Sequence, residues 1–283
     1  MNAYLNRKVA QSEHIPESNP AESYFMDDKR EAERLASKVN APKWVEKYLG
    51  PHLRSGMSVL DVGCGPGVIA NSAAIAYPNS RFVGVDISAQ RLKQSPFSAT
   101  PNLELKSADV FSLPFSNECF DLVYCRFLLE YLQSPQLAIN EMCRVLKPGG
   151  SLLLQDLDGQ LVWHYPEDED LQRNLNSIVT SLQATGFDPF VGRKLFNFAQ
   201  LAGLDEIEVN LEKYHLYPGQ IDRENESLWT TKLEIALPTI EKILGNANSA
   251  QKLTHQFLDY LRRKDTLTYS VIFTVLGKKG SHC

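Results

Sequence analysis

Short apolar segments alternate with helix-like stretches through the first half of the chain. Five segments have the Val, Leu, Ile and Phe content of buried strands, namely residues 58–62, 81–86, about 103–106, 120–125 and 151–156. Residues 68–76 and 135–146 have the composition of helices, and the second stretch ends in KPGG, a proline–glycine stop. Strands that alternate with helices predict an α/β fold with a parallel sheet.

The regular alternation stops after residue 158. Residues 171–186 form a helical run, residues 192–204 are expected to be a helix that returns to the sheet, and a strand is predicted at about 206–214. After a long and mostly helical stretch, alternating β-branched residues predict a last strand at 268–276. We interpret the helical stretches outside the alternation as a cap over the sheet.

The residues before the sheet are expected to form a polar arm at 1–20, a helix at 21–39 and a short helix at 42–49. We divide the whole chain into six segments, namely an arm with lid helices (1–50), a ligand-binding core (51–158), a cap insertion (159–190), a core helix and strand (191–218), a helical cap insertion (219–266) and a last strand with a tail (267–283).

A glycine-rich turn follows the first predicted strand. Residues 58–70 read SVLDVGCGPGVIA, in which Gly63, Gly65 and Gly67 separate a strand from a helix. Strand, glycine turn and helix present a ligand to the strand ends of a doubly wound sheet, and glycines let the backbone approach it closely. Asp61 adds a carboxylate at the same crevice. The alternative is a tight strand-to-helix connection without a ligand.

The next strand indicates what kind of ligand this turn would bind. Asp86 ends that strand 19 residues after Gly67, and an acidic residue there hydrogen-bonds ribose hydroxyls. Two ligands with a ribose fit, NAD and S-adenosylmethionine. An NAD turn normally reads GxGxxG, whereas Val68 follows the last glycine and Pro66 lies within the turn. Asp61 would repel a pyrophosphate but suits the ammonium group of S-adenosylmethionine.

The motifs VLDVGCGPG and VGVDIS resemble the first two motifs of the class I S-adenosylmethionine-dependent methyltransferases, and EMCRVLKPGGSLLLQDLD resembles their fifth-strand motif. The resemblance covers residues 58–158. It implies a doubly wound, Rossmann-like sheet of seven mostly parallel strands, whose last strand is antiparallel and lies beside strand five, with a helical cap. It also implies S-adenosyl-L-methionine as the cofactor and S-adenosyl-L-homocysteine as its product.

The resemblance, together with the residues above, predicts cofactor contacts at Asp61, Gly63, Cys64, Gly65, Gly67, Asp86, Ile87, Asp109, Val110, Cys125, Arg126, Arg34 and Tyr24. In similar enzymes the residue at Asp109 contacts the adenine amino group, Val110 packs beside the ring, and an arginine placed like Arg34 pairs with the methionine carboxylate. Asp109 could instead be a turn aspartate, and Arg126 could pair with Glu130, four residues later. Arg34 and Tyr24 could lie on a solvated helix face.

Methyl transfer from a sulfonium needs orientation more than covalent help, and orientation is worth about 7–11 kcal/mol at best. A hydroxyl or ammonium acceptor must still lose a proton, for which a histidine is the usual base. His164 is the leading candidate, ahead of His14 and His215. Four residues are predicted to contact the methyl acceptor, namely Asp156, Asp158, Trp163 and Trp229.

Composition narrows the possible partners. The 283 residues carry a net charge of −5 with a pI near 5.7, unlike the basic footprint of a nucleic-acid binder. Cys125-Arg126-Phe127-Leu128 stands where amino-methylating enzymes of DNA bases and glutamine carry NPPY. The five cysteines show no metal spacing, and no apolar run reaches the ~18 residues of a membrane span. We expect a cytoplasmic monomer or homodimer without a metal.

The sequence therefore predicts an enzyme that moves a methyl group from S-adenosylmethionine to an oxygen or nitrogen of a small, fairly apolar metabolite, such as a specialised natural product. A regulatory protein that binds this cofactor without turnover is an alternative, and an NAD-dependent oxidoreductase is a less favoured one. Methylation of a protein or RNA is a further, weaker alternative.

Overall fold

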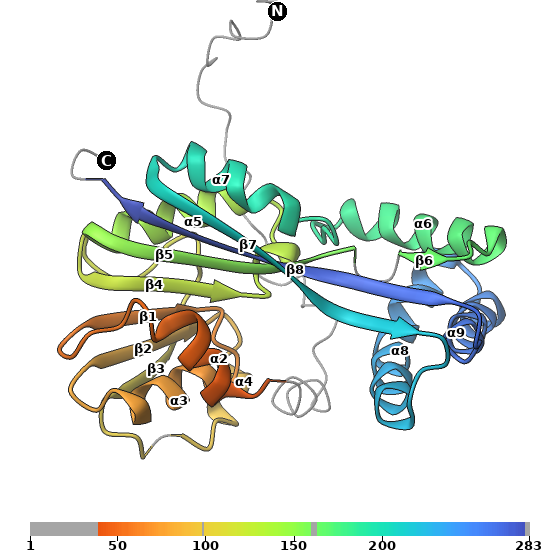
Figure 1. Ribbon diagram of the computed structural model, residues 1–283, viewed down its shortest axis with the longest axis horizontal. Coiled ribbons are helices and arrows are strands. Elements are labelled where there is room, and N and C mark those ends of the chain that lie inside the picture. Colours follow the sequence, from red (N-terminus) through yellow and green to blue (C-terminus); the bar gives the residue numbers. More distant parts are fainter. Residues whose placement is uncertain (1–38, 98, 160–162, 281–283) are drawn as a thin grey trace, which may run out of the picture.

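The computed structural model describes residues 39–97, 99–159 and 163–280, and within them a sheet of eight strands forms the centre of the molecule (Figure 1). The strands are β1 (Ser58–Val62), β2 (Arg81–Asp86), β3 (Leu103–Ser107), β4 (Phe120–Arg126), β5 (Leu146–Asp158), β6 (His164–Tyr165), β7 (Leu204–Pro218) and β8 (Leu267–Lys279). Six of them follow the order β3-β2-β1-β4-β5-β8, and β6 and β7 each pair with β8. The first five strands in this order are parallel. The predicted fold class is confirmed, with the two-residue β6 as an addition.

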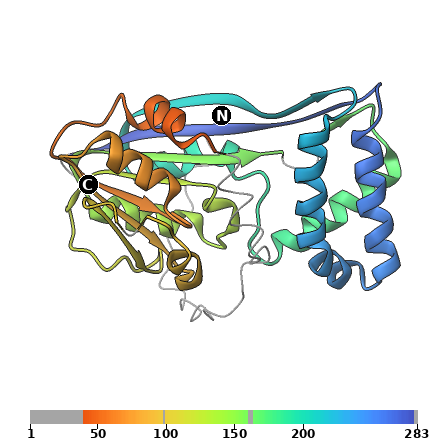
Figure 2. The ribbon, with the colours of Figure 1, turned by 90° about the horizontal axis from the view of Figure 1, so that it is seen from below.

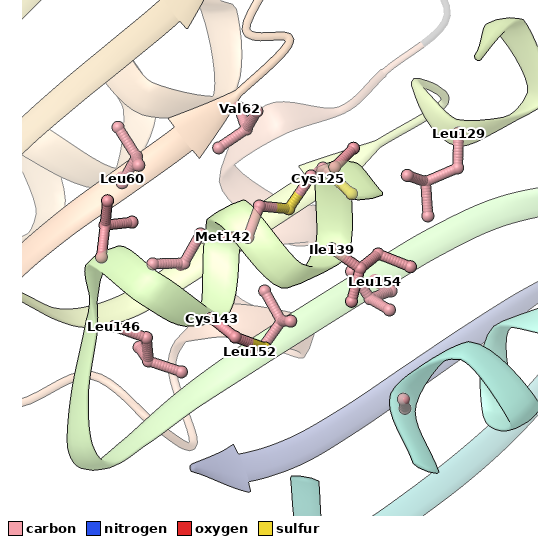
Figure 3. Packing of buried hydrophobic residues seen from close by; sticks show 14 of the residues in the cluster. Leu60, Val62, Cys125, Leu129, Ile139, Met142, Cys143, Leu146, Leu152 and Leu154 are labelled. Atoms are coloured by element: carbon pink, nitrogen blue, oxygen red, sulfur yellow. The ribbon is translucent and has the colours of Figure 1, made fainter. Parts of the chain in front are cut away.

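Helices cover both faces of the parallel strands. The helical segments of the core are α2 (Ala41–Trp44), η1 (Val45–Leu49), α3 (Val68–Ala76), α4 (Ala89–Lys93), η2 (Leu129–Tyr131), α5 (Pro135–Val145), η3 (Gly192–Lys194) and α7 (Leu195–Leu201). Trp44 and Leu49 pack with Phe82 on one face. On the other face, Met142 and Ile139 of α5 belong to the largest buried cluster (Figure 3). The helices therefore form one packed layer on each face of the parallel strands.

A long antiparallel ribbon leads out of this core. β7 pairs with β8 from Leu204 opposite Lys279 to Pro218 opposite Leu267. On the other edge of β8, pairing with β5 ends at Asp158 opposite Val271, so the ribbon continues past the last core strand. The predicted strands at 206–214 and 268–276 were therefore too short, because pairing in the ribbon extends both of them beyond their alternating residues.

Three helices pack together at the far end of the ribbon (Figures 1 and 2). They are α6 (Glu169–Gln183), α8 (Arg223–Leu244) and α9 (Ala247–Leu261), and they share a hydrophobic cluster separate from those of the core. We call these three helices the helical unit. Core and helical unit lie on the same side of the ribbon, and the carboxyl ends of the parallel strands point toward the helices (Figure 2). Among the described residues, no helix has both the length and the apolar character needed to cross a bilayer.

Phe257 is central to the helical unit, where its side chain is 1% exposed and packs against Trp229. We expect Phe257→Ala to lower the free energy of unfolding by about 3–5 kcal/mol, because the substitution leaves a cavity in a closed cluster. Urea unfolding followed by circular dichroism measures the change. Phe196→Ala is the matched control, since the Phe196 side chain is 42% exposed and loses little buried surface. Equal losses in the two variants would contradict the assignment of a separate buried cluster.

Candidate functional site

The glycine turn is folded against the end of β2. The backbone N–H groups of Gly63 and Cys64 both donate to the Val85 carbonyl, at 2.8 and 2.9 Å. Gly65 has a φ of +56°, a left-handed conformation that favours glycine, and a Cβ built on it would meet no atom within 4 Å. Gly67 begins α3 with a φ of +83°. The turn thus leaves an open backbone surface at Gly65 where a ligand can approach.

Asp86 connects this turn to the segment after β2. Its side chain is 5% exposed, and its two oxygens accept hydrogen bonds from the backbone N–H groups of Gly65 (2.9 Å) and Ser88 (2.8 Å). Arg91 lies 3.6 Å from the same carboxylate. Each carboxylate oxygen has lone pairs for more than one donor, so Asp86 can also accept from ligand hydroxyls. Ile87 follows it with an exposed side chain.

The end of β3 brings two more predicted contacts to the same edge. The Ala108 N–H donates to the Asp86 carbonyl at 3.1 Å, which places Asp109 and Val110 directly beyond the end of β2. Asp109 Oδ1 accepts a hydrogen bond from the Phe111 N–H at 2.9 Å, so the residue does form a turn, as the alternative predicted. This turn uses one carboxylate oxygen and leaves the role of Asp109 as an adenine contact a prediction.

Asp61 is buried one strand away from Asp86. It pairs with Gly84 on one side and with Tyr124 on the other. Loss of hydration raises the pKa of the Asp61 carboxyl to about 7; the adjacent Tyr124 hydroxyl opposes this rise, and the Asp86 carboxylate adds to it. The crevice therefore holds a carboxyl group that is partly protonated at neutral pH and that a ligand cation would ionise.

Arg126 lies at the last position of β4, on the side toward β5. Its Nε donates to Gln155 Oε1 at 3.2 Å, and its guanidinium lies 3.7 Å from the centre of the Phe127 ring. Gln155 is itself held by Trp44 Nε1 and Thr274 Oγ1, each at 2.7 Å. The predicted alternative, an ion pair of Arg126 with the glutamate four residues later, is not formed: within the part of the chain that the structure describes, Arg126 forms no ion pair with a carboxylate.

Two carboxyl groups are buried beside the turn that follows β4. Asp156 accepts hydrogen bonds from the backbone N–H groups of Leu129 (2.9 Å), Glu130 (3.2 Å) and Leu157 (2.9 Å). Burial raises the pKa of Asp156 to about 7, against the effect of these three donors. Burial, and then the charge of Asp156, raise the pKa of Glu130 well above its usual range. Glu130 Oε2 has no hydrogen-bond partner among the described residues.

The other predicted acceptor contacts are spread along the ribbon. Asp158 makes a bidentate ion pair with Arg193, whose Nη2 lies 2.6 Å from Asp158 Oδ1. Trp163 contacts Tyr269, with ring centres 5.2 Å apart. The structure thus places Asp158 in a structural ion pair, and its role in binding an acceptor stays a prediction, as does that of Trp163.

Trp229 belongs to the helical unit, and His164 of β6 packs against it. His164 Nδ1 lies 2.9 Å from Thr268 Oγ1, and its ring packs against Phe257 and Tyr260. It pairs with Thr268, three residues along β8 from the partner of Asp158, which is about 10 Å past the end of β5. The catalytic role of His164 and the acceptor contact of Trp229 therefore stay predictions.

Several predicted residues lie elsewhere or outside the described residues. The Cys125 side chain belongs to the buried cluster under α5 (Figure 3), and its contact with a cofactor stays a prediction. Arg34, Tyr24 and His14 lie outside the described residues. In the described ranges, no cluster of His, Cys, Asp or Glu side chains is arranged to hold a metal ion.

Sequence reasoning did not assign to this site four residues that the structure places there, namely Trp44, Tyr124, Gln155 and Glu130, of which only Glu130 was named, as an ion-pair partner. Two of them carried a usable signal. Gln155 interrupts the apolar strand SLLLQDLD, and Glu130 interrupts the apolar run FLLEYL. A polar residue within a buried segment needs a partner or a function. Trp44 reaches the site only through the packing of α2, which the sequence pattern does not specify.

Known proteins resemble this chain in both sequence and fold. A family model described as a methyltransferase domain matches residues 53–214. The chain is 28% identical over 168 residues to an uncharacterised methyltransferase of Schizosaccharomyces pombe, covering 56% of this chain and 60% of that protein. It is 34% identical over 139 residues to the probable methyltransferase ltbC of Aspergillus luteorubrus, covering 44% and 48%. The chain thus spans about half the length of these curated relatives.

A solved structure shares the fold over most of the chain. A putative methyltransferase from Bacillus halodurans superposes with a TM-score of 0.55 at 19% identity, covering 85% of this chain and 99% of that one. At this identity the likeness establishes the common fold.

The raised pKa of Asp61 makes stability depend on pH. Between the usual aspartate pKa near 4 and the folded value of about 7, the folded chain binds more protons than the unfolded chain. Stability must therefore fall as pH rises, by on the order of 2 kcal/mol from pH 5 to 8 for this carboxyl alone. We expect Asp61→Asn to flatten the curve by that amount in urea unfolding at pH 5, 6, 7 and 8. Asp170→Asn, on the exposed face of α6, should keep the wild-type slope, and an unchanged slope in Asp61→Asn would refute the assignment.

Proposed function

This chain belongs to the class I S-adenosylmethionine-dependent methyltransferases, and we propose that it transfers a methyl group from S-adenosylmethionine to an oxygen or nitrogen of a small, fairly apolar metabolite, such as a specialised natural product. The observation that carries this proposal is the position of Asp86. Its carboxylate is fixed by the glycine turn and by the segment after β2, at the place where a ribose would be recognised.

The residues of the first strand ends fit this cofactor. Asp86 keeps lone pairs for two ribose hydroxyls, and Ile87 offers an exposed apolar surface to the adenine ring. We assign Asp109 and Val110 to the far edge of the adenine. Asp61, whose carboxyl pKa is raised in the free protein, is assigned to the ammonium group of the methionine part, because a cation beside it would stabilise the charged carboxylate. The open surface at Gly65 lets the cofactor lie against the backbone.

The acceptor is assigned to the space between the end of β4 and the helical unit. Phe127 and Tyr214 form a T-shaped pair there, with ring centres 5.3 Å apart, and both are partly exposed. Such a surface suits an apolar acceptor. Two residues are candidates for the general base that removes the proton of a hydroxyl or amine acceptor. The sequence indicates His164. Glu130 lies shortly after β4, and its Oε2 has no hydrogen-bond partner among the described residues.

The proposal includes the partners. We infer a small-molecule acceptor and no nucleic-acid substrate, which the net charge of −5 supports. We also infer a monomer or homodimer that works in the cytoplasm. The alternative of a regulatory protein predicts cofactor binding without transfer, and the alternative of an oxidoreductase predicts stabilisation by NAD instead of S-adenosylhomocysteine. Thermal shift with the two ligands, followed by a transfer assay, separates the three cases.

We expect Asp86→Asn to weaken S-adenosylhomocysteine binding by about 10- to 100-fold, because a charge-assisted acceptor for ribose hydroxyls is lost while the side-chain shape is kept. Titration calorimetry measures the affinity. Asp121→Asn is the matched control: Asp121 lies on β4 and pairs with Lys147 at the amino end of the strand, far from the glycine turn. Unchanged affinity in Asp86→Asn would refute the ribose assignment and, with it, the observation that carries the proposal.

The methyl acceptor is first identified by transfer of tritiated methyl groups into an extract of the source organism. The general base is then tested with that acceptor. Glu130→Gln and His164→Gln are compared for kcat and for S-adenosylhomocysteine affinity. Replacement of the group that removes the proton should lower kcat by about 100-fold or more without weakening cofactor binding, since general-base catalysis accelerates a reaction by about 10²–10⁴-fold. A kcat within threefold of the wild type removes that residue as the base.

A further inference from the structure

The guanidinium group of Arg126 has hydrogen-bonding capacity that the protein does not use. Of its five N–H donors, only Nε–H is bound by another described residue, namely by Gln155 Oε1 at 3.2 Å. In the described ranges neither Nη atom makes a hydrogen bond or an ion pair, although desolvation is strong enough to lower the pKa of this arginine. A cation that is partly withdrawn from water without a counter-ion is costly, which points to a ligand that supplies the negative charge.

The nearby carboxyl groups Asp156 and Asp61 favour the charged guanidinium, but they balance its charge only in part at neutral pH. Burial raises the pKa values of Asp61 and Asp156 to about 7, and that of Glu130 well above its usual range. With pKa values of about 7, Asp61 and Asp156 are only partly ionised at neutral pH. One unbalanced guanidinium matches a single negative charge, and its planar pair of Nη donors matches the two oxygens of a carboxylate.

The protein holds Arg126 in one orientation. Gln155 fixes Nε and is fixed in turn by Trp44 and Thr274, and the Phe127 ring supports the flat face of the guanidinium at 3.7 Å. Phe127 has a φ of +55°, in the left-handed region that bulky residues avoid. Backbone strain of this kind persists where a side chain must be held in one place for function.

Arg126 is itself one of the predicted cofactor contacts, but its guanidinium is bound on the side of β4 that faces β5, away from the other predicted contacts. The glycine turn and Asp86 lie at the ends of β1 and β2, whereas the Arg126 side chain extends from β4 to Gln155 on β5. On that side Phe127 faces Tyr214 of β7, and the ring series continues through His215 and Trp229 into the helical unit. Arg126 thus lies at one end of a series of aromatic rings that starts at the carboxyl end of β4, of which Phe127 and Tyr214 are partly exposed.

We propose that Arg126 binds a carboxylate of the methyl acceptor with its two Nη groups, and that the acceptor is accordingly an aromatic or otherwise apolar carboxylic acid. This inference rests on the proposed methyltransferase function and names the substrate class of the same site. The carboxylate lies between the Nη groups, and the apolar body of the acceptor lies along Phe127 and Tyr214. The methyl-accepting atom is then held at a fixed distance from the anionic group.

The test uses the full chain saturated with S-adenosylhomocysteine, and phenylacetate and its neutral isostere phenylacetamide as probes. We expect phenylacetate to bind the wild-type complex at least about tenfold more tightly than phenylacetamide in ligand-observed NMR titrations. Equal affinities would overturn the proposal, and this comparison does not depend on the folding of any variant. Failure of the wild-type chain to bind S-adenosylhomocysteine would instead overturn the proposed function itself.

Variants then assign the preference to Arg126. Arg126→Gln should weaken phenylacetate binding by about tenfold or more and leave phenylacetamide unchanged, whereas Arg126→Lys should keep part of the preference because the charge remains. Arg81→Gln, at the start of β2 and paired with Glu104, is the matched control. A preference that survives in Arg126→Gln would overturn the proposal.

A last comparison separates the acceptor from the cofactor as the source of the carboxylate. S-Adenosylhomocysteine has a methionine-derived carboxylate, which 5′-methylthioadenosine lacks. We expect Arg126→Gln to change the affinities of both ligands by less than about threefold in titration calorimetry. Selective weakening of S-adenosylhomocysteine would show that Arg126 binds the cofactor carboxylate, and the proposal would be wrong.

Discussion

The pairing of β7 with β8 is the constraint on which the arrangement of the site depends. One edge of β8 pairs with β5, and the other edge pairs with β7 along its whole length. The chain between these two strands forms α8 and α9, so both ends of that helical pair are tied to neighbouring strands. Because the ribbon continues past the last core strand, it holds the helical unit opposite the carboxyl ends of the parallel strands.

Polar side chains follow one face of this ribbon, and most of them are satisfied. Thr274 accepts a hydrogen bond from Gln155, Ser270 lies 2.9 Å from His215, and Thr268 lies 2.9 Å from His164. A buried polar group with a partner costs little free energy, whereas one without a partner costs several times more. Among the described residues, Glu130 Oε2 is buried without a hydrogen-bond partner and the Nη atoms of Arg126 form no hydrogen bond; these two residues flank a single turn after β4. The proposed ligand is placed at this turn for that reason.

The site has two halves that are built in different ways. The half at β1 and β2 consists of residues that are close in sequence to a strand end, and a few backbone hydrogen bonds fix Asp86 to the glycine turn. The half at β4 and β5 depends on residues from α2, β5, β7 and β8, which meet only when the sheet is complete. Asp61 lies at the border between the two halves, and the pKa of its carboxyl is raised because both halves exclude water from it.

The sequence by itself determined the parallel sheet, the order of its elements and the family, and it predicted the cofactor half of the site. These depend on local patterns, namely apolar strands, a glycine turn and an acidic residue at a fixed spacing. Such patterns can be recognised in the sequence without knowledge of distant contacts. Only the tertiary structure decided that Arg126 has no carboxylate partner within the described residues, that Asp158 is paired with Arg193, and that His164 packs against the helical unit. Those facts depend on pairings between residues 29 to 104 positions apart, and the local pattern of either segment does not specify a long-range partner.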